Sequence, residues 1–316
     1  MRILKRGKVF DPREYSLPAG LSLYAKSPQA VVFDDFVRVY FSSQRVDSQD
    51  KWLSVPIFAD FNKNFSKVLR VADEPAINLG SLGHFDEHGI FPFNVVPHHN
   101  GFRAYTSGWS RRKAVSIDMA IGLAHSDDGV HFVKVGDGGP LLSANVDEPC
   151  LVGDPFVMVD NGFHHMWYIY GSKWMRRRPE EAPERFYRIA YAASKDGIEW
   201  HRDSKYIIPT RQADECQALP TVFKRDGVFH MFFCYRNAFG FRDDPEHSYR
   251  LGYAFSDDLK VWHRDDDVEG LTVSESGWDS QMMCYPNTFK IDDTYFLLYN
   301  GNDFGMYGFG IAEVIF

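Results

Sequence analysis

The stretch DPFVMVDNGFHHMWYIYGS, residues 154–172, decides the fold because four other segments repeat its pattern. Each copy has a proline, a short apolar run, a tight turn and an aromatic-rich run. The prolines are Pro28, Pro92, Pro155, Pro220 and Pro286, spaced 64, 63, 65 and 66 residues apart. The other copies read SPQAVVFDDFVRVYFSS, FPFNVVPHHNGFRAYTSGW, LPTVFKRDGVFHMFFCYRN and YPNTFKIDDTYFLLYNGN. Self-similarity at such a period indicates a fold built from repeated sheets.

The two runs of each copy are joined by residues that favour a hairpin turn. These turn residues are Asp34-Asp35, Asn100-Gly101, Asn161-Gly162, Asp226-Gly227 and Asp292-Asp293. A proline at the first position of a strand costs no ladder hydrogen bond, which fits its place in each copy. Each copy therefore predicts an antiparallel pair of strands.

Further strands follow the hairpins. The runs IGLAHSDDGVHF, IAYAASKDGIEWHR, LGYAFSDDLKVWHR and FGIAEVIF predict third strands, and the first three lead by a turn into a fourth strand carrying Phe132, Trp200 or Trp262. Four antiparallel strands in five copies predict a five-bladed β-propeller that forms a single domain over residues 1–316. The last copy lacks a fourth strand, and residues 3–10 are expected to supply it and close the ring, which hides two sheet edges.

Composition supports an all-β, soluble protein. The 316 residues are 44% hydrophobic and 16% aromatic, and no segment has a capped helical pattern longer than three turns. The formal charge of −8 argues against nucleic-acid binding, and no apolar run is long enough to span a membrane. The N-terminus lacks a signal-peptide pattern and the four cysteines lack a C-x-x-C spacing, so a cytoplasmic protein is expected.

Polar and aromatic residues cluster on one face of the predicted ring. The start of each first strand and the end of each second strand lie on the same face, and the tight hairpins lie on the other. The first face carries carboxylates, arginines, tryptophans and amides, whereas the hairpins carry turn residues. Sugars offer hydroxyls to polar groups and C–H faces to aromatic rings, so a carbohydrate or glycoconjugate is the expected ligand.

Two short motifs resemble glycoside hydrolases. Gly153-Asp154-Pro155 resembles the R-D-P motif of family 32, and Asp214-Glu215-Cys216 resembles its E-C motif. Five-bladed propellers with acids at the inner strands look like families 32, 43, 62, 68, 117 and 130. Phe91 stands where the family 32 motif N-D-P-N would place its acid, and no Asp precedes Pro28, where family 43 has its base.

A wider resemblance covers nearly the whole chain. The runs GHFDEHGIFP, YRLGYAFSDDLKVWHR, GWDSQMMCYPN and LLYNGNDFGMYGFGIA are similar to bacterial glycoside-hydrolase-like proteins that are often encoded near surface-polysaccharide genes. They are also similar to the propeller domain of plant glucosaminyl inositolphosphorylceramide transferases. This resemblance implies a propeller that handles sugars.

Three acids are the catalytic candidates. Glycosidic cleavage needs an acid for the leaving oxygen and a second carboxylate. Glu215 is the predicted general acid/base, Asp154 would orient hydroxyls or tune Glu215, and Asp86 is the candidate nucleophile or base. Each has a structural alternative: Glu215 accepting backbone N–H groups, Asp154 forming a turn, and Asp86 solvating a loop.

Further side chains are candidates for substrate binding. Acids and polar groups would bind hydroxyls, tryptophans would stack on sugar rings, and an arginine would bind a carboxylate or phosphate. These residues are Glu87, His88, Trp109, Trp174, Gln217, Arg236, Trp278, Asp279, Tyr285, Asn287, Asn300 and Asn302. The alternatives are packing for the tryptophans, ion pairing for Arg236, and loop capping for the asparagines.

Two functions therefore remain open at this point. One is a glycoside hydrolase or transglycosidase that uses paired carboxylates on a surface-polysaccharide-type sugar. The other is a non-catalytic glycan-binding propeller that supports polysaccharide or glycolipid assembly. No metal site or cofactor is indicated, although a divalent cation in the central channel stays open, and the sequence names no protein partner.

Overall fold

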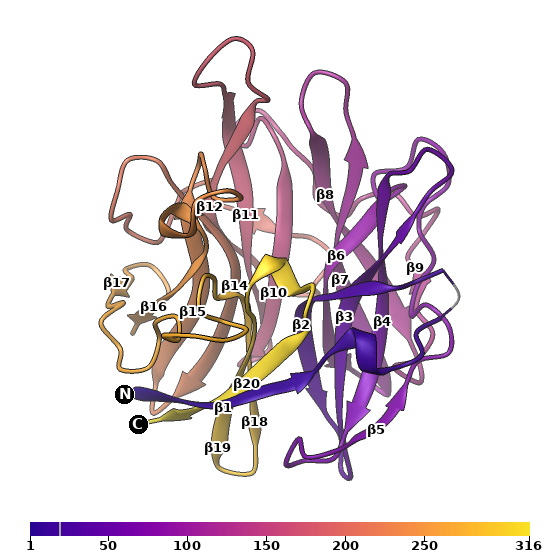
Figure 1. Cartoon of the computed structure of the whole chain (residues 1–316), viewed down its shortest axis with the longest axis vertical. Helices are drawn as coiled ribbons and strands as arrows, with labels where there is room; N and C mark the ends of the chain where they lie inside the picture. Colours follow the sequence, from indigo (N-terminus) through magenta and orange to yellow (C-terminus); the bar gives the residue numbers. More distant parts are fainter. Residues whose placement is uncertain (19) are drawn as a thin grey trace.

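The computed structural model describes residues 1–18 and 20–316 and consists almost wholly of β-strands (Figure 1). Within these residues there are twenty strands and three short 3-10 helices, η1 (Pro12–Glu14), η2 (Pro245–His247) and η3 (Asp303–Gly305). The prediction of an all-β chain is confirmed. None of the helices in the described part is long and apolar enough to cross a membrane.

Two sheets contain four consecutive strands of the chain, each paired antiparallel with the next. The first contains β10 (Val152–Asp160), β11 (Phe163–Met175), β12 (Glu184–Ser194) and β13 (His201–Arg202). The second contains β14 (Glu215–Arg225), β15 (Val228–Asn237), β16 (Arg250–Ser256) and β17 (His263–Arg264).

An eight-stranded sheet contains the strands from β2 to β9. One half is β2 (Leu23–Val32), β3 (Val37–Val46), β4 (Trp52–Phe61) and β5 (Val68–Val71), and the other is β6 (Gly89–His98), β7 (Gly101–Arg111), β8 (Ile117–Ser126) and β9 (Val133–Lys134). Strands pair antiparallel within each half. The halves are joined by one parallel pair, Ser54 with Gly89.

The fourth sheet combines the two ends of the chain. It has the order β1 (Arg2–Phe10), β20 (Phe309–Ile315), β19 (Thr294–Asn300) and β18 (Cys284–Ile291). β1 runs antiparallel to β20, with Arg2 opposite Ile315, so the two termini lie side by side (Figure 1).

The hairpin turns match the expected positions in four of five copies, and one differs by a residue. The loops are residues 33–36, Asn161-Gly162, Asp226-Gly227 and Asp292-Asp293. In the second copy the loop is His99-Asn100, and Gly101 already pairs with His98. A Cβ at Gly101 would be 2.4 Å from the carbonyl oxygen of Ser126, so this position in the strand needs a glycine.

Three aromatic residues link neighbouring sheets or sheet halves. The fourth strands β9, β13 and β17 are only two residues long, and Phe132, Trp200 and Trp262 lie just before them. Each ring meets an aromatic residue of the preceding group edge to face. The pairs are Phe132 with Tyr40, Trp200 with Tyr105 and Trp262 with Trp167, at centroid distances of 5.8, 5.9 and 6.3 Å. Such pairs add stability beyond burial alone.

The first strands of the repeated copies lie next to one another. β2 contacts β6, β6 contacts β10, β10 contacts β14, β14 contacts β18, and β18 contacts β2. Buried side chains fill the spaces between the sheets in three hydrophobic clusters. The starts of these five strands therefore converge.

Candidate active site

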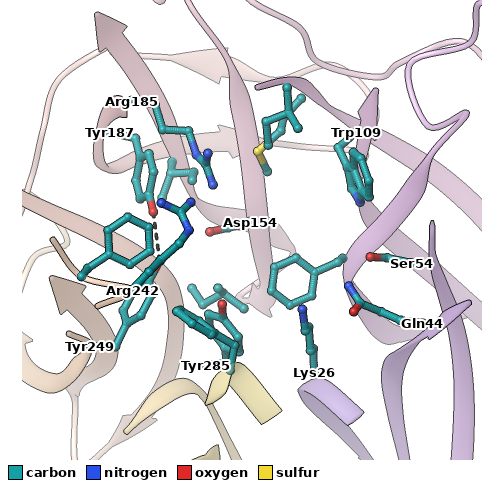
Figure 2. Close-up of a pocket in the computed structure, with 17 residues that line it drawn as sticks. Lys26, Gln44, Ser54, Trp109, Asp154, Arg185, Tyr187, Arg242, Tyr249 and Tyr285 are labelled. Atoms are coloured by element: carbon teal, nitrogen blue, oxygen red, sulfur yellow. Dashed lines mark hydrogen bonds between the residues drawn. The ribbon is translucent and has the colours of Figure 1, made fainter. Parts of the chain in front are cut away.

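A cavity of about 300 Å³ lies where the five first strands begin (Figure 2). Each of the five strands contributes one lining residue: Lys26 from β2, Phe91 from β6, Asp154 from β10, Leu219 from β14 and Tyr285 from β18. The last four immediately precede the repeated prolines. The repeat therefore places five different side chains around one pocket.

The other walls come from later strands and loops. Trp109 on β7 and Met119 on β8 stand on one side, and Arg185 and Tyr187 on β12 stand on another. The remaining lining residues are Gln44, Ser54, Ile117, Ile169, Phe241, Arg242, Tyr249 and Phe304. The pocket thus joins aromatic surfaces to cations and hydrogen-bonding groups, as a polar ligand with apolar faces requires.

Asp154 lies at a strained point of β10. Its φ of +52° is in the left-handed region, and the ladder of β10 and β11 is irregular between Gly153 and Phe156. The backbone N–H of Asp154 donates to Ser107 Oγ at 3.2 Å. A Cβ at Gly153 would lie 2.7 Å from the same Ser107 oxygen, so the close approach of β10 to β7 needs a glycine there.

The Asp154 carboxyl is buried, with 4% of the residue exposed. Burial raises the pKa of Asp154 to about 7, against the lowering effects of the Leu219 backbone N–H and the nearby Arg185 charge. A carboxyl with such a pKa holds a proton near neutral pH and can act as a general acid.

Three cations face the same space (Figure 2). Burial lowers the pKa of Lys26 to about 8, and Lys26 forms no ion pair with any described residue. Arg185 Nε is buried without a hydrogen-bond partner in the described part of the chain, and its Nη1 donates weakly to Ser116 Oγ at 3.4 Å. Arg242 pairs with Glu184. Lys26 and Arg185 are therefore available to an anionic ligand.

Two tyrosines form a hydroxyl pair in the pocket wall. The Tyr187 and Tyr249 oxygens are 3.0 Å apart, as the dashed line in Figure 2 marks. Arg236, predicted to bind substrate directly, lies behind this pair and donates to both oxygens. It is 1% exposed and is not one of the lining residues.

The other predicted acids are held in ion pairs outside this pocket. Lys134 Nζ lies 2.5 Å from Asp86 Oδ2, although the angles are not those of a hydrogen bond. Arg264 Nη1 donates to Glu215 Oε1 at 2.7 Å, and Lys5 Nζ donates to Asp279 Oδ2 at 2.9 Å. A fourth pair of this kind joins Arg202 to Glu148 at 2.6 Å.

These four pairs occupy corresponding places. Each acid lies at or just before the first strand of its group, and each cation lies on the fourth strand, β9, β13, β17 or β1. The pairs therefore connect the inner and outer edges of a sheet. The sequence predicts that Glu215 and Asp86 line the same pocket as Asp154, but neither is among the residues that line it. Their catalytic roles stay predictions that this geometry does not support.

The remaining predicted residues divide into two groups. Trp109 and Tyr285 line the pocket, and His88 stacks near Trp109 with ring centroids 6.0 Å apart. The others contact protein groups instead. Gln217 donates to Glu215, Glu87 accepts from Gly83, Trp278 stacks on Tyr299, and Trp174 packs against the core.

The three predicted asparagines hold backbone segments together. Asn287 accepts from the Ala30 N–H, Asn300 accepts from the Ser27 N–H, and Asn302 accepts from the Gln281 and Met282 N–H groups. These contacts correspond to the capping alternative, and a role in substrate binding stays a prediction.

Sequence reasoning missed most of the lining residues, among them the charged and tyrosine side chains Lys26, Arg185, Tyr187, Arg242 and Tyr249. The position of Lys26 could have been predicted, because it lies two residues before the repeated Pro28, near the start of a first strand. Arg185 and Tyr187 begin a third strand, and Arg242 and Tyr249 follow the last residues of a second strand. No repeated pattern marks these four positions.

A second cavity of about 560 Å³ lies beside β7 and β8, lined among others by His84, Glu87, Arg112 and Asp118. Arg112 and Asp118 form an ion pair there. Across residues 1–18 and 20–316, no group of three or more His, Cys, Asp or Glu side chains is arranged to hold a metal ion.

Known proteins resemble this one over its whole length, although no family model matches it. It is 30% identical over 314 residues to the uncharacterized protein Rv1502 of Mycobacterium tuberculosis (strain ATCC 25618 / H37Rv), covering 98% of this chain and 97% of that protein. This chain is a member of the Rv1502 family. The Rv1502-family protein described here is also 28% identical over 159 residues to a 1,2-beta-oligomannan phosphorylase of Thermoanaerobacter sp. (strain X514), which covers 48% of this chain and 47% of the enzyme.

Solved structures share the fold of this Rv1502-family protein. One described as a glycoside hydrolase has a TM-score of 0.72 at 16% identity, covering 98% of this chain and 92% of that protein. A thermostable family-43 glycoside hydrolase has a TM-score of 0.68 at 16% identity, with coverage of 96% and 93%. The beta-1,2-mannobiose phosphorylase of Listeria innocua has a TM-score of 0.67 at 13% identity, with coverage of 99% and 97%. The predicted resemblance to glycoside-hydrolase propellers is confirmed in the fold.

Proposed function

We propose that this protein is a glycoside phosphorylase, an enzyme that transfers a glycosyl group between a sugar hydroxyl and inorganic phosphate. The observation that carries the proposal is the pocket's charge: one buried carboxyl, Asp154, shares the pocket with Lys26 and Arg185, which pair with no carboxylate in the described part of the chain. The names of the phosphorylase relatives are in accord with it.

Asp154 acts as the general acid in this proposal. A phosphate oxygen forms a bond to the anomeric carbon while the bond from that carbon to the leaving oxygen breaks. The leaving oxygen keeps the electron pair and takes the proton of Asp154, and the phosphate proton is released to restore the acid. The products are a glycosyl phosphate and a free sugar hydroxyl, and no cofactor is needed.

Phosphate takes the place that a second carboxylate has in a hydrolase. Paired-carboxylate mechanisms need two acids about 5–10 Å apart across the glycosidic bond. Asp154 is the one carboxylate among the described lining residues, whereas Asp86, Glu215 and Asp279 pair with lysine or arginine elsewhere. Lys26 and Arg185 are suited instead to bind the anion that attacks.

Aromatic groups would bind the sugar. Trp109 and Phe91 offer flat apolar surfaces, and Gln44 and Ser54 offer hydrogen bonds to hydroxyls. We propose a glycan or glycoconjugate as the ligand and a cytoplasmic setting, where phosphate is abundant. We expect no nucleic-acid ligand, because the formal charge of the protein is −8.

We also propose that residues 1–316 form a single domain with five blades around the pocket. The cyclic contacts of β2, β6, β10, β14 and β18 support five groups of strands. The pairing of β1 with β20 supports completion of the last blade by the N-terminal strand. The single parallel pair between Ser54 and Gly89 would be a contact between two adjacent blades.

The test is phosphorolysis itself. The full-length protein is incubated with inorganic phosphate and a panel of oligosaccharides, and glycosyl phosphate is measured by mass spectrometry. We expect a glycosyl phosphate with the wild type and none with Asp154→Asn. Release of free sugar at the same rate with and without phosphate would contradict the proposal and favour a hydrolase. The absence of any product, with glycan binding retained, would favour the non-catalytic alternative.

A further inference from the structure

Arg236 is a buried cation for which the described structure shows no carboxylate partner. Its Nη1 donates to the backbone carbonyls of Asn237 and Ala238 at 2.8 and 3.1 Å, and its guanidinium lies 3.6 Å from the centroid of the Phe241 ring. Its other hydrogen bonds go to the Tyr187 and Tyr249 hydroxyls. Burying an arginine this way is costly, so its use must be sought in what it contacts.

Arg236 occupies the acceptor positions of Tyr187. The Tyr187 oxygen accepts from Arg236 Nε at 3.2 Å and from Nη2 at 3.0 Å. A hydroxyl oxygen has two lone pairs and one hydrogen. Tyr187 thus accepts one hydrogen bond of its own from Nη2 and a share of the Nε–H, whereas Tyr249 receives only the shared Nε–H, so the Tyr187 O–H is the one favoured to donate across the 3.0 Å between the two oxygens.

Tyr249 is then the end of the chain of hydrogen bonds. Its oxygen accepts from Tyr187 and shares the single Nε–H of Arg236, at 3.2 Å, with the Tyr187 oxygen, and its own hydrogen has no acceptor among the described residues. Tyr249 lines the pocket, so this hydrogen can reach a ligand. Burial raises the pKa of Tyr249 well above its ordinary value, so the hydroxyl keeps this proton at neutral pH.

We propose that Arg236 is a positioning residue that orders the hydrogen bonds from Arg236 through Tyr187 to Tyr249, so that Tyr249 donates its hydrogen to an oxygen of the phosphate bound in the pocket. The inference rests on the proposed function, because it takes phosphate as the ligand. It assigns the two tyrosines unequal roles, although they face the same cavity. Tyr249 contacts the anion, and Tyr187 transmits the direction set by Arg236.

The experiment measures binding of inorganic phosphate to the full-length protein by isothermal titration calorimetry, without any glycan. Tyr249→Phe should weaken binding at least about tenfold, because a hydrogen bond to a charged group is lost. Tyr187→Phe should weaken it by about threefold or less, since Tyr249 still accepts from Arg236 and still donates. The matched control is Tyr253→Phe: Tyr253 is also buried, but its hydroxyl pairs with His230 outside the pocket.

Arg236→Met tests the positioning role. In the wild-type background it should weaken phosphate binding, and in the Tyr249→Phe background it should add almost nothing, because its effect passes through that hydroxyl. Phosphate binding should also change the ultraviolet absorption of tyrosine in the wild type, and this change should be absent from Arg236→Met and from Tyr249→Phe. If Arg236→Met does not fold, as a thermal melt would reveal, the comparison of Tyr249→Phe with Tyr187→Phe still decides.

The outcomes separate this inference from the proposed function. Equal losses in Tyr187→Phe and Tyr249→Phe, or no loss in either, would overturn the ordering while phosphate binding by the wild type stands. Additive losses from Arg236→Met and Tyr249→Phe would overturn the positioning role of Arg236. A wild-type protein that binds no phosphate would overturn both proposals.

Discussion

Arg264 Nη1 lies 2.7 Å from Glu215 Oε1, and this pair joins the outermost strand β17 to the start of the innermost strand β14. Both side chains are buried, with 5% and 0% of their surface exposed. Lys134 with Asp86, Arg202 with Glu148, and Lys5 with Asp279 make the same connection elsewhere. A contact that recurs in this way has a structural explanation that does not involve a ligand.

Glu215→Gln should therefore affect stability more than catalysis. The substitution removes the charge that Glu215 presents to Arg264, which keeps Asp266 as its second partner at 2.8 Å, so the loss should be smaller than the about 3–5 kcal/mol of a buried charge left without any partner. Urea unfolding should reveal the loss, with the exposed Glu275→Gln as the control. Turnover per folded molecule should stay at the wild-type level. A large fall in turnover with unchanged stability would restore Glu215 as the catalytic acid.

Asp154→Asn should abolish turnover, because the amide has no proton to give to the leaving oxygen. General acid catalysis accounts for about 10²–10⁴-fold in rate, so a fall of at least a hundredfold is expected. In the wild type, the acid is protonated below its pKa of about 7, so the rate of phosphorolysis should fall as pH rises through 7. A rate that increases through this range would contradict the assignment.

The same carboxyl should make stability depend on pH. The pKa of Asp154 is about 7 in the folded protein against 3.8 for an ordinary Asp, so the folded state retains the proton that the unfolded chain loses. Stability should then fall as pH rises from about 4 to about 7, by roughly 4 kcal/mol for this group. Compared with the wild type, Asp154→Asn should be more stable at pH 8 and little changed at pH 4. Equal effects at both pH values would rule out the raised pKa.

Lys26→Met should weaken phosphate binding about tenfold, since a charge-assisted hydrogen bond to the anion is lost. The pKa of Lys26 is about 8 in the folded protein, so the positive charge is present below pH 8 and is lost above it. The ratio of wild-type to variant affinity should accordingly shrink as pH rises through 8. Calorimetric titrations of both proteins across this range would measure the ratio, and a constant ratio would contradict the role of Lys26.

The sequence predicts the fold better than the site because the same strand–turn–strand pattern recurs in five segments, whereas the site residues do not recur. A proline recurs in each copy, and the structure has a first strand at each of Pro28, Pro92, Pro155, Pro220 and Pro286. The prolines are not at the predicted first position of these strands but inside them, where the ladder with the second strand is irregular. The one displaced turn, at His99-Asn100, leaves Gly101 in the strand and close to Ser126, a contact with a distant residue that no local pattern contains.

For the site, the acids that recur at similar positions in several copies belong to the scaffold, and the acid that occurs in one copy lines the pocket. Asp86, Glu148, Glu215 and Asp279 each lie between five and seven residues before a repeated proline, which indicates a scaffold role. Asp154 has no counterpart in the other copies, and it is the acid that lines the pocket. Arg185 and Tyr249 reach the pocket from positions that differ between copies, so their placement depends on tertiary structure alone.

The pairing of β1 with β20 has a consequence for synthesis of the protein. β1 leaves the ribosome before every other strand described, and its partner β20 leaves after all of them. The N-terminal segment must therefore wait without its partner until β20 has been made, and during that time its edge is open to wrong partners. Its charged residues Arg2, Lys5, Arg6 and Lys8 would help to keep the nascent segment in solution.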